Sequence, residues 1–141
     1  MSESTFAGSC LCGSVAYEIR GEPWRFYHCH CERCRKASGT GHASNILIRN
    51  PSSVVWTAGE SLLTYYKVPE AERFATNFCS NCGSLMPRVA PDLSFVAIPA
   101  GTLDHEPDVR PEARIFQDSR AEWSCDDSGI PGYDQYPPAP D

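Results

Sequence analysis

The spacing of the cysteines restricts the fold of this chain more than any other feature. The chain has 8 cysteines in 141 residues, and all but Cys125 fall into three short motifs. The N-terminal residues 1–6 have neither a basic region nor an apolar run, so they do not resemble a secretory signal. We therefore expect reduced cysteines in the cytoplasm, where closely spaced thiols favour metal binding over disulfides. The motifs are Cys10-Leu11-Cys12-Gly13, Cys29-His30-Cys31-Glu32-Arg33-Cys34 and Cys79-Ser80-Asn81-Cys82-Gly83.

Composition disfavours several other kinds of protein. The length suits one domain, and 41% hydrophobic with 21% charged residues argues against a disordered chain. No stretch approaches the roughly 20 apolar residues that a membrane helix needs. The net charge of −6 disfavours binding to nucleic-acid phosphates. We expect a cytoplasmic domain that contacts neither membrane nor nucleic acid, and composition does not indicate its oligomeric state.

Between the cysteine motifs the sequence has the features of β-strands. Tyr17 and Ile19 alternate with polar residues, the period of a half-buried strand. Pro87 interrupts one weaker strand candidate, which suits a sheet edge. The one expected helix runs from about Cys31 to Ser38 and ends at the following glycines. The other strand candidates, rich in β-branched and aromatic residues, are residues 53–57, 62–68 and 93–98, with weaker ones at 84–89 and 113–116.

These patterns predict a mainly β fold, a single zinc-bound domain of short antiparallel sheets. We place the domain at residues 1–135 and a loose, Pro-rich tail at residues 136–141. The domain would owe part of its stability to metal, because its sheets are short and its turns numerous.

Each cysteine motif can direct its sulfurs toward one point. A C-x-x-C pair followed by glycine, as in Cys79 and Cys82, is typical of a zinc knuckle, because the glycine permits a tight backbone. In an extended segment residues i and i+2 share a face, so Cys10 and Cys12 converge, and Cys29 and Cys31 do likewise. The third cysteine of the middle motif, at position 34, can fold back through a turn.

Counting ligands suggests two different sites. A closed structural zinc takes four protein ligands, whereas a catalytic zinc keeps three and an open position. Cys10, Cys12, Cys79 and Cys82 would form the closed site, and Cys29, Cys31 and Cys34 the open one. Spacing leaves an alternative in which His28, His30 or Cys125 closes the middle site. We assign no role to His42 and His105.

The chemistry of three thiolates suits a sulfur substrate. Zinc bound by three thiolates carries a net charge of −1 and is a weak Lewis acid, but a thiol that joins it loses its proton. Such a sulfur can add to a small carbonyl carbon, and the reverse reaction cleaves a carbon–sulfur bond. The neighbouring Arg33, Arg35 and Lys36 either bind carboxylates of an anionic thiol or form a solvated basic patch.

The three motifs in this order resemble the glutathione-dependent formaldehyde-activating enzyme family, whose domain is also called GFA or centromere-protein-V-type. The resemblance rests on residues 8–15, 29–36 and 78–84, continues in residues 100–104, 111–116, 123 and 129–133, and covers about residues 6–134. It implies a β-tent fold with two zinc ions, a lyase activity that joins glutathione and formaldehyde into S-hydroxymethylglutathione, and a ligand set for each ion. The structural zinc would lie on Cys10, Cys12, Cys79 and Cys82, and the catalytic, labile zinc on Cys29, Cys31 and Cys34.

Three functions are compatible with this pattern. The first is a zinc-dependent carbon–sulfur lyase acting on a small thiol such as glutathione and a small aldehyde. The second is a glutathione-binding or carrier protein without catalysis. The third is a zinc-stabilised interaction module in which His28 or His30 closes the middle site. The sequence does not identify the true thiol, the aldehyde or the residues that contact substrate carboxylates.

Overall fold

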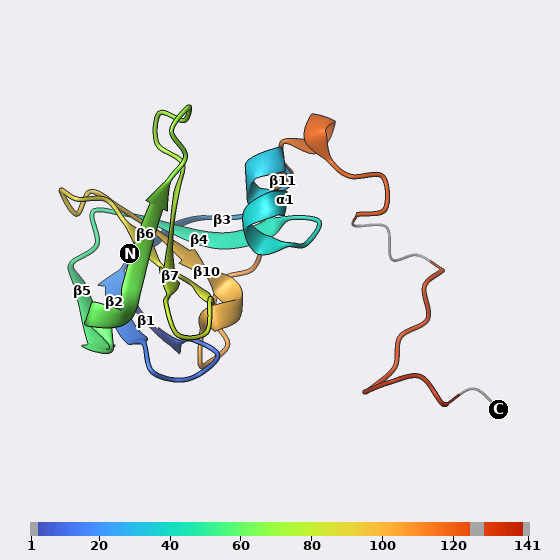
Figure 1. Ribbon diagram of the computed structural model, residues 1–141, viewed down its shortest axis with the longest axis horizontal. Helices are drawn as coiled ribbons and strands as arrows, with labels where there is room; N and C mark the ends of the chain where they lie inside the picture. Colours follow the sequence, from blue (N-terminus) through green and yellow to red (C-terminus); the bar gives the residue numbers. More distant parts are fainter. Residues whose placement is uncertain (1–2, 125–128, 140–141) are drawn as a thin grey trace.

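The computed structural model describes residues 3–124 and 129–139 of the chain. This part contains three small β-sheets and one short α-helix (Figure 1). The expected mainly β fold is therefore confirmed. The boundary at residue 135 stays a prediction, and Cys125 lies outside the described residues.

The first sheet is antiparallel and has the order β1-β2-β5. Tyr17 and Ile19 of β2 are buried, as their alternation with polar residues predicted. The turn between β1 and β2 carries the first cysteine motif. The strands are β1 (Ser4–Ser9), β2 (Ala16–Gly21) and β5 (Ser53–Ala58).

The second sheet has the order β11-β3-β4-β10-β9. Its β11 runs parallel to β3, an exception to the antiparallel arrangement that we expected. The β10 strand begins later than predicted, because Leu93 adopts a left-handed turn conformation with φ 60°, and it continues one residue past the predicted end, to Pro99. The strands are β3 (Pro23–Cys29), β4 (Ala43–Arg49), β9 (Arg88–Val89), β10 (Phe95–Pro99) and β11 (Ala113–Ile115).

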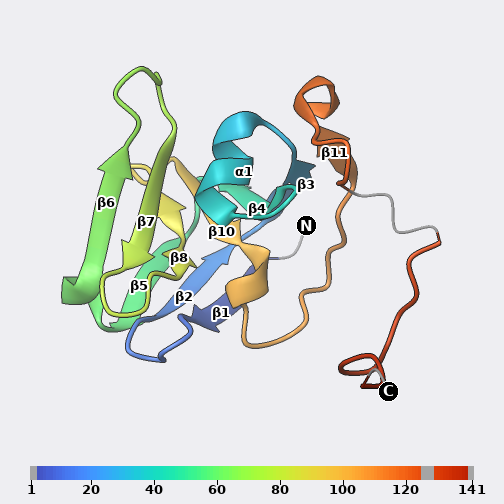
Figure 2. The ribbon, with the colours of Figure 1, turned by 45° about the vertical axis from the view of Figure 1, so that its right-hand side comes forward.

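The third sheet has the order β6-β7-β8, and the loop between β6 and β7 projects from the body in both views (Figures 1 and 2). Pro87 separates β8 from β9, so each of these two-residue strands lies at the edge of a different sheet. This is the edge position that the proline predicted. The strands are β6 (Leu63–Lys67), β7 (Ala75–Cys79) and β8 (Leu85–Met86).

The α1 helix (Glu32–Ser38) begins and ends as the sequence indicated. Cys31 is its N-cap, and the Cys31 Sγ accepts a hydrogen bond from the backbone N–H of Cys34 at 3.3 Å. Gly39 ends the helix in a left-handed conformation with φ 73°, which glycine adopts without steric cost. Short 3₁₀ helices follow elsewhere, at η1 (Glu60–Leu62), η2 (Ala100–Thr102) and η3 (Gln117–Ser119).

The hydrophobic core joins all three sheets and includes two of the cysteines. Cys10 and Cys79 are buried in it, with exposed fractions of 5% and 0%. The other large members are Phe6, Tyr17, Ile19, Phe26, Ile46, Ile48, Met86, Val96 and Ile98. None of the described helices is long and apolar enough to cross a membrane.

Candidate metal centres

The first and third cysteine motifs meet where the β1–β2 turn approaches the β7–β8 turn (Figure 2). The four Sγ atoms lie within 4.8 Å of one another, with Cys10–Cys12 at 3.6 Å and Cys12–Cys79 at 3.9 Å. Tetrahedral zinc with bonds of about 2.3 Å requires sulfurs about 3.8 Å apart. The four-cysteine cluster, made of Cys10, Cys12, Cys79 and Cys82, therefore has the donor atoms and the spacing of a closed metal site.

The local backbone explains this convergence. Gly83 has φ 81°, and its N–H donates to the carbonyl of Cys79 at 2.7 Å, which closes the tight turn that the C-x-x-C-Gly motif predicted. Two further groups donate to sulfur, the Val15 N–H to Cys10 at 3.3 Å and the Asn81 side-chain amide to Cys12 at 3.2 Å. Donors of this kind stabilise thiolates.

Hydrogen bonds also shift the thiol pKa values in this cluster. The hydroxyl of Ser84 lowers the pKa of Cys82 to about 5, and hydrogen bonds from Ser14 and then Asn81 lower that of Cys12 to about 7. Burial raises the pKa of Cys79. The thiolate is the form that binds a metal, so two of the four ligands are prepared for it by their neighbours.

The second cysteine motif forms its own cluster at the junction of β3 and α1. Cys29 is the last residue of β3, Cys31 caps the helix, and Cys34 lies in its first turn. Their Sγ atoms lie within 4.8 Å of one another, and this three-cysteine cluster does not include His28 or His30. The described structure thus brings together the three thiols that the spacing predicted.

The sulfurs of the three-cysteine cluster compete for a proton. The hydrogen bond between Cys34 and Cys29 lowers the pKa of Cys29 to about 6 and raises the pKa of Cys34, since one thiol must donate to the other thiolate. A cation that prefers thiolate ligands would replace these shared protons. Zinc fits this donor set by ligand type.

The histidines flanking the motif gather on another side of β3. The His28 Nδ1 lies 2.9 Å from the Ser44 Oγ, which also lies 3.2 Å from the His42 Nδ1. The ring centroids of His28 and His42 are 4.2 Å apart, and those of His30 and His42 are 5.1 Å apart. Neighbouring residues of a strand point to opposite faces, so His28 faces away from Cys29. We assigned no role to His42 from the sequence, because it joins these histidines only through the pairing of β3 with β4.

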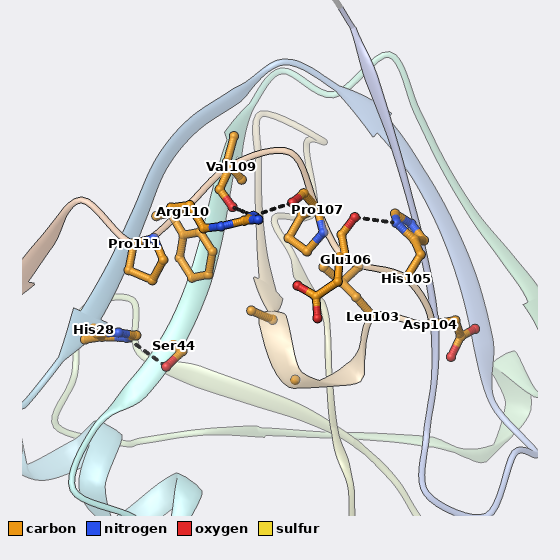
Figure 3. Close-up of a pocket in the computed structure, with 13 residues that line it drawn as sticks. His28, Ser44, Leu103, Asp104, His105, Glu106, Pro107, Val109, Arg110 and Pro111 are labelled. Carbon is orange, nitrogen blue, oxygen red and sulfur yellow. Dashed lines mark hydrogen bonds between the residues drawn. The ribbon is translucent and has the colours of Figure 1, made fainter. Parts of the chain in front are cut away.

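This histidine side opens on a pocket of about 560 Å³ (Figure 3). His28 and Ser44 form one wall, and residues 103–107 and 109–111 form the other. The guanidinium of Arg110 is held within this segment, where it donates to the carbonyls of Pro107 and Val109 at 2.7 and 3.0 Å. His105 accepts a hydrogen bond from the β1 strand, which is a structural contact. None of the described cysteines lines this pocket, so it lies apart from the cysteine sulfurs.

A small cavity of about 80 Å³ adjoins the three-cysteine cluster instead. Cys34, Asn45, Phe74 and Arg88 are among the residues that line it. The sequence analysis did not identify Arg88 as a site residue. Only the packing of the second and third sheets brings it near the α1 helix.

Of the predicted basic patch, two members line a neighbouring pocket of about 740 Å³. These are Arg33 and Lys36, which share the pocket with Glu32 and Glu70. Arg35 does not line it, and its Nε is buried without a hydrogen-bond partner in the described residues. The three basic residues therefore do not form one continuous patch, because Arg35 lies on a different side of the α1 helix from Arg33 and Lys36.

The fold and the two clusters define a class of small β domains with two groups of cysteines that can each hold a metal ion. The chain matches the model of the glutathione-dependent formaldehyde-activating enzyme family, GFA, over residues 5–119, and it belongs to that family.

Two individual proteins illustrate the relationship. A curated Halomonas elongata protein named "Putative glutathione-dependent formaldehyde-activating enzyme" is 33% identical over 85 residues, which cover 56% of this chain and 52% of that protein. The alignment thus spans about half the length of that relative. A crystal structure of a Rhodobacter sphaeroides protein is 22% identical and superimposes with a TM-score of 0.53 over 77% of this chain and 97% of that one. This second likeness supports the fold.

Proposed function

We propose that this protein is a zinc-dependent carbon–sulfur lyase or synthase that acts on a small thiol, such as glutathione, and a small aldehyde. The observation that carries the proposal is the three-cysteine cluster, which has the ligand number of a catalytic zinc site and borders a cavity. The family supports glutathione and formaldehyde as the substrates. In the reaction the thiol sulfur bonds to the carbonyl carbon, and the carbonyl oxygen takes the thiol proton to give S-hydroxymethylglutathione.

The two clusters would have different roles. Cys10, Cys12, Cys79 and Cys82 would hold a structural zinc, and Cys29, Cys31 and Cys34 would hold a labile catalytic zinc. When bound at the second cluster, zinc would supply the positive charge that keeps a substrate thiol deprotonated at neutral pH.

The residues of this chain would prepare that site. The backbone N–H of Cys34 donates to the Cys31 Sγ at 3.3 Å and so reduces the negative charge on one ligand. Phe74 and Ala37 line the adjoining cavity and exclude part of the water. A cavity of about 80 Å³ has room for a few atoms, which suits a small aldehyde.

The test is the rate of S-hydroxymethylglutathione formation, measured by exchange NMR at equilibrium with the zinc-loaded protein. We expect a faster exchange than in buffer, and we expect Cys31→Ser to abolish the increase while the far-UV spectrum is retained. Glutathione binding without faster exchange would favour a carrier protein and overturn the enzyme proposal.

A second measurement distinguishes an open middle site from one that a fourth protein ligand closes. In cobalt-substituted protein, glutathione is expected to change the sulfur-to-metal charge-transfer band. An unchanged band would support an interaction module with a closed site. Loss of one metal in His28→Ala, His30→Ala or Cys125→Ser would then identify the fourth ligand.

A further inference from the structure

A basic pocket of about 710 Å³ lies on the far side of Arg88 from the cysteine cavity. Its walls come from the end of β4, the β6 strand, the loop after β6 and the turn that follows β9. The loop after β6 is the one that projects from the body in Figures 1 and 2. Segments distant in sequence therefore converge here.

The pocket concentrates positive charge in a chain whose net charge is −6. Glu72 is the carboxylate among its lining residues. Within residues 3–124 and 129–139 the ion pairs are Arg20–Glu3 and Arg25–Glu112, so no described carboxylate pairs with the pocket cations. An excess of unpaired cations in one concavity attracts anions. The cations are Arg49, Lys67, Arg73 and Arg88.

Three of these cations are held in place by their neighbours. The Arg49 guanidinium stacks 3.5 Å from the ring centroid of Trp24. The Lys67 ammonium donates to the carbonyls of Val68 and Ala71, and Arg88 lies 5.5 Å from the Phe95 ring centroid. Positioning of this kind lowers the entropy cost of binding an anion.

Arg88 lies between this basic pocket and the three-cysteine cluster. It lines both the basic pocket and the cavity that Cys34 lines. Arg88 is half-buried, so its charge is partly desolvated, and an anionic ligand would offset that cost. A peptide of three residues spans up to about 10 Å, and a thiol bound through its sulfur at the cysteines would use that length to place its carboxylates beyond Arg88.

The pocket at Arg33 and Lys36 is a weaker candidate for the same ligand. Its two cations face two carboxylates, Glu32 and Glu70, so its lining carries no net charge. The basic pocket has four cations against one carboxylate. The charge balance therefore favours the pocket beyond Arg88.

We propose that Arg49, Arg73 and Arg88, with Lys67, form the subsite that binds the carboxylates of the thiol substrate. The inference rests on the proposed function, and it places substrate selectivity in the β6–β7 loop and the end of β4. Guanidinium groups suit this role because they bind carboxylates through paired hydrogen bonds.

The binding test uses S-methylglutathione, which has the carboxylates of glutathione and a blocked sulfur. Calorimetry with the zinc-loaded protein is expected to give a dissociation constant that rises roughly tenfold or more in the double variant Arg49→Gln, Arg73→Gln. Both positions are exposed, so the fold should persist. Arg88→Gln, checked by circular dichroism, should have a similar effect.

The matched control is the double variant Arg33→Gln, Lys36→Gln, which removes the same charge from the competing pocket. It is expected to bind S-methylglutathione within about twofold of the unmodified protein, a difference of less than 0.5 kcal/mol. Weaker binding in the control with unchanged binding in the Arg49 and Arg73 variant would overturn the proposal. Failure of the unmodified protein to bind S-methylglutathione would overturn it too.

An activity test separates this inference from the proposed function. The Arg49 and Arg73 variant is expected to raise KM for glutathione more than for uncharged 2-mercaptoethanol. Equal changes for the two thiols would overturn the subsite but leave the lyase. Absence of any rate increase in the unmodified protein would overturn the lyase, and S-methylglutathione binding would then decide the subsite by itself.

Discussion

The two cysteine clusters offer the same donor atoms but occupy very different places in the fold. The four-cysteine cluster joins the β1–β2 turn to the β7–β8 turn, and two of its members lie in the hydrophobic core. The three-cysteine cluster lies within one motif, at a strand end and a helix start, next to a cavity. A ligand set that links distant segments is expected to determine stability, whereas a local one can gain or lose its metal with little effect on the fold.

The largest expected effect follows from removing one cysteine of the four-cysteine cluster. We expect Cys79→Ser to prevent cooperative folding, since structural zinc contributes about 10 kcal/mol or more of apparent folding free energy. Thermal unfolding followed by circular dichroism measures this. Cys31→Ser is the matched control, because it also removes one thiol, and its transition should persist. An intact transition in Cys79→Ser would show that the two clusters do not differ in this way.

A chelator should distinguish the clusters by order of metal loss. We expect the three-cysteine cluster to release its zinc first, because its three ligands leave one position open to a competitor. Metal content and far-UV circular dichroism, recorded over the same titration, should show one zinc lost before the spectrum changes. Simultaneous loss of both ions with unfolding would contradict the comparison.

A smaller effect is expected from a hydrogen bond to a ligand. Asn81→Ala removes the amide that lies 3.2 Å from the Cys12 Sγ and helps to lower the pKa of that thiol to about 7. We expect a loss of about 1 kcal/mol in the free energy of unfolding, measured with denaturant on the zinc-loaded protein. Ser80→Ala, at the neighbouring position between the two cysteines, serves as the control and should be nearly neutral.

Much of the secondary structure could be predicted from local patterns. The alternation at Tyr17 and Ile19, the break at Pro87 and the helix end at Gly39 all have local causes, and the structure confirms them. The strands β1, β3, β4 and β7 were not predicted. The β3 strand contains no Val, Ile or Thr, and its pairing with β4 and β11 depends on partners elsewhere in the chain.

The cysteine spacing by itself determined which thiols of one motif can converge, because the reach of a C-x-C or C-x-x-C segment is local. Only the tertiary structure decided that the first motif meets the third, and what surrounds the thiols. It placed His28 and His42 away from the sulfurs and brought Arg88 between the cavity of Cys34 and the basic pocket. The reason is that charge and cavity shape around a site come from segments far apart in the chain, whose approach is set by sheet pairing and core packing.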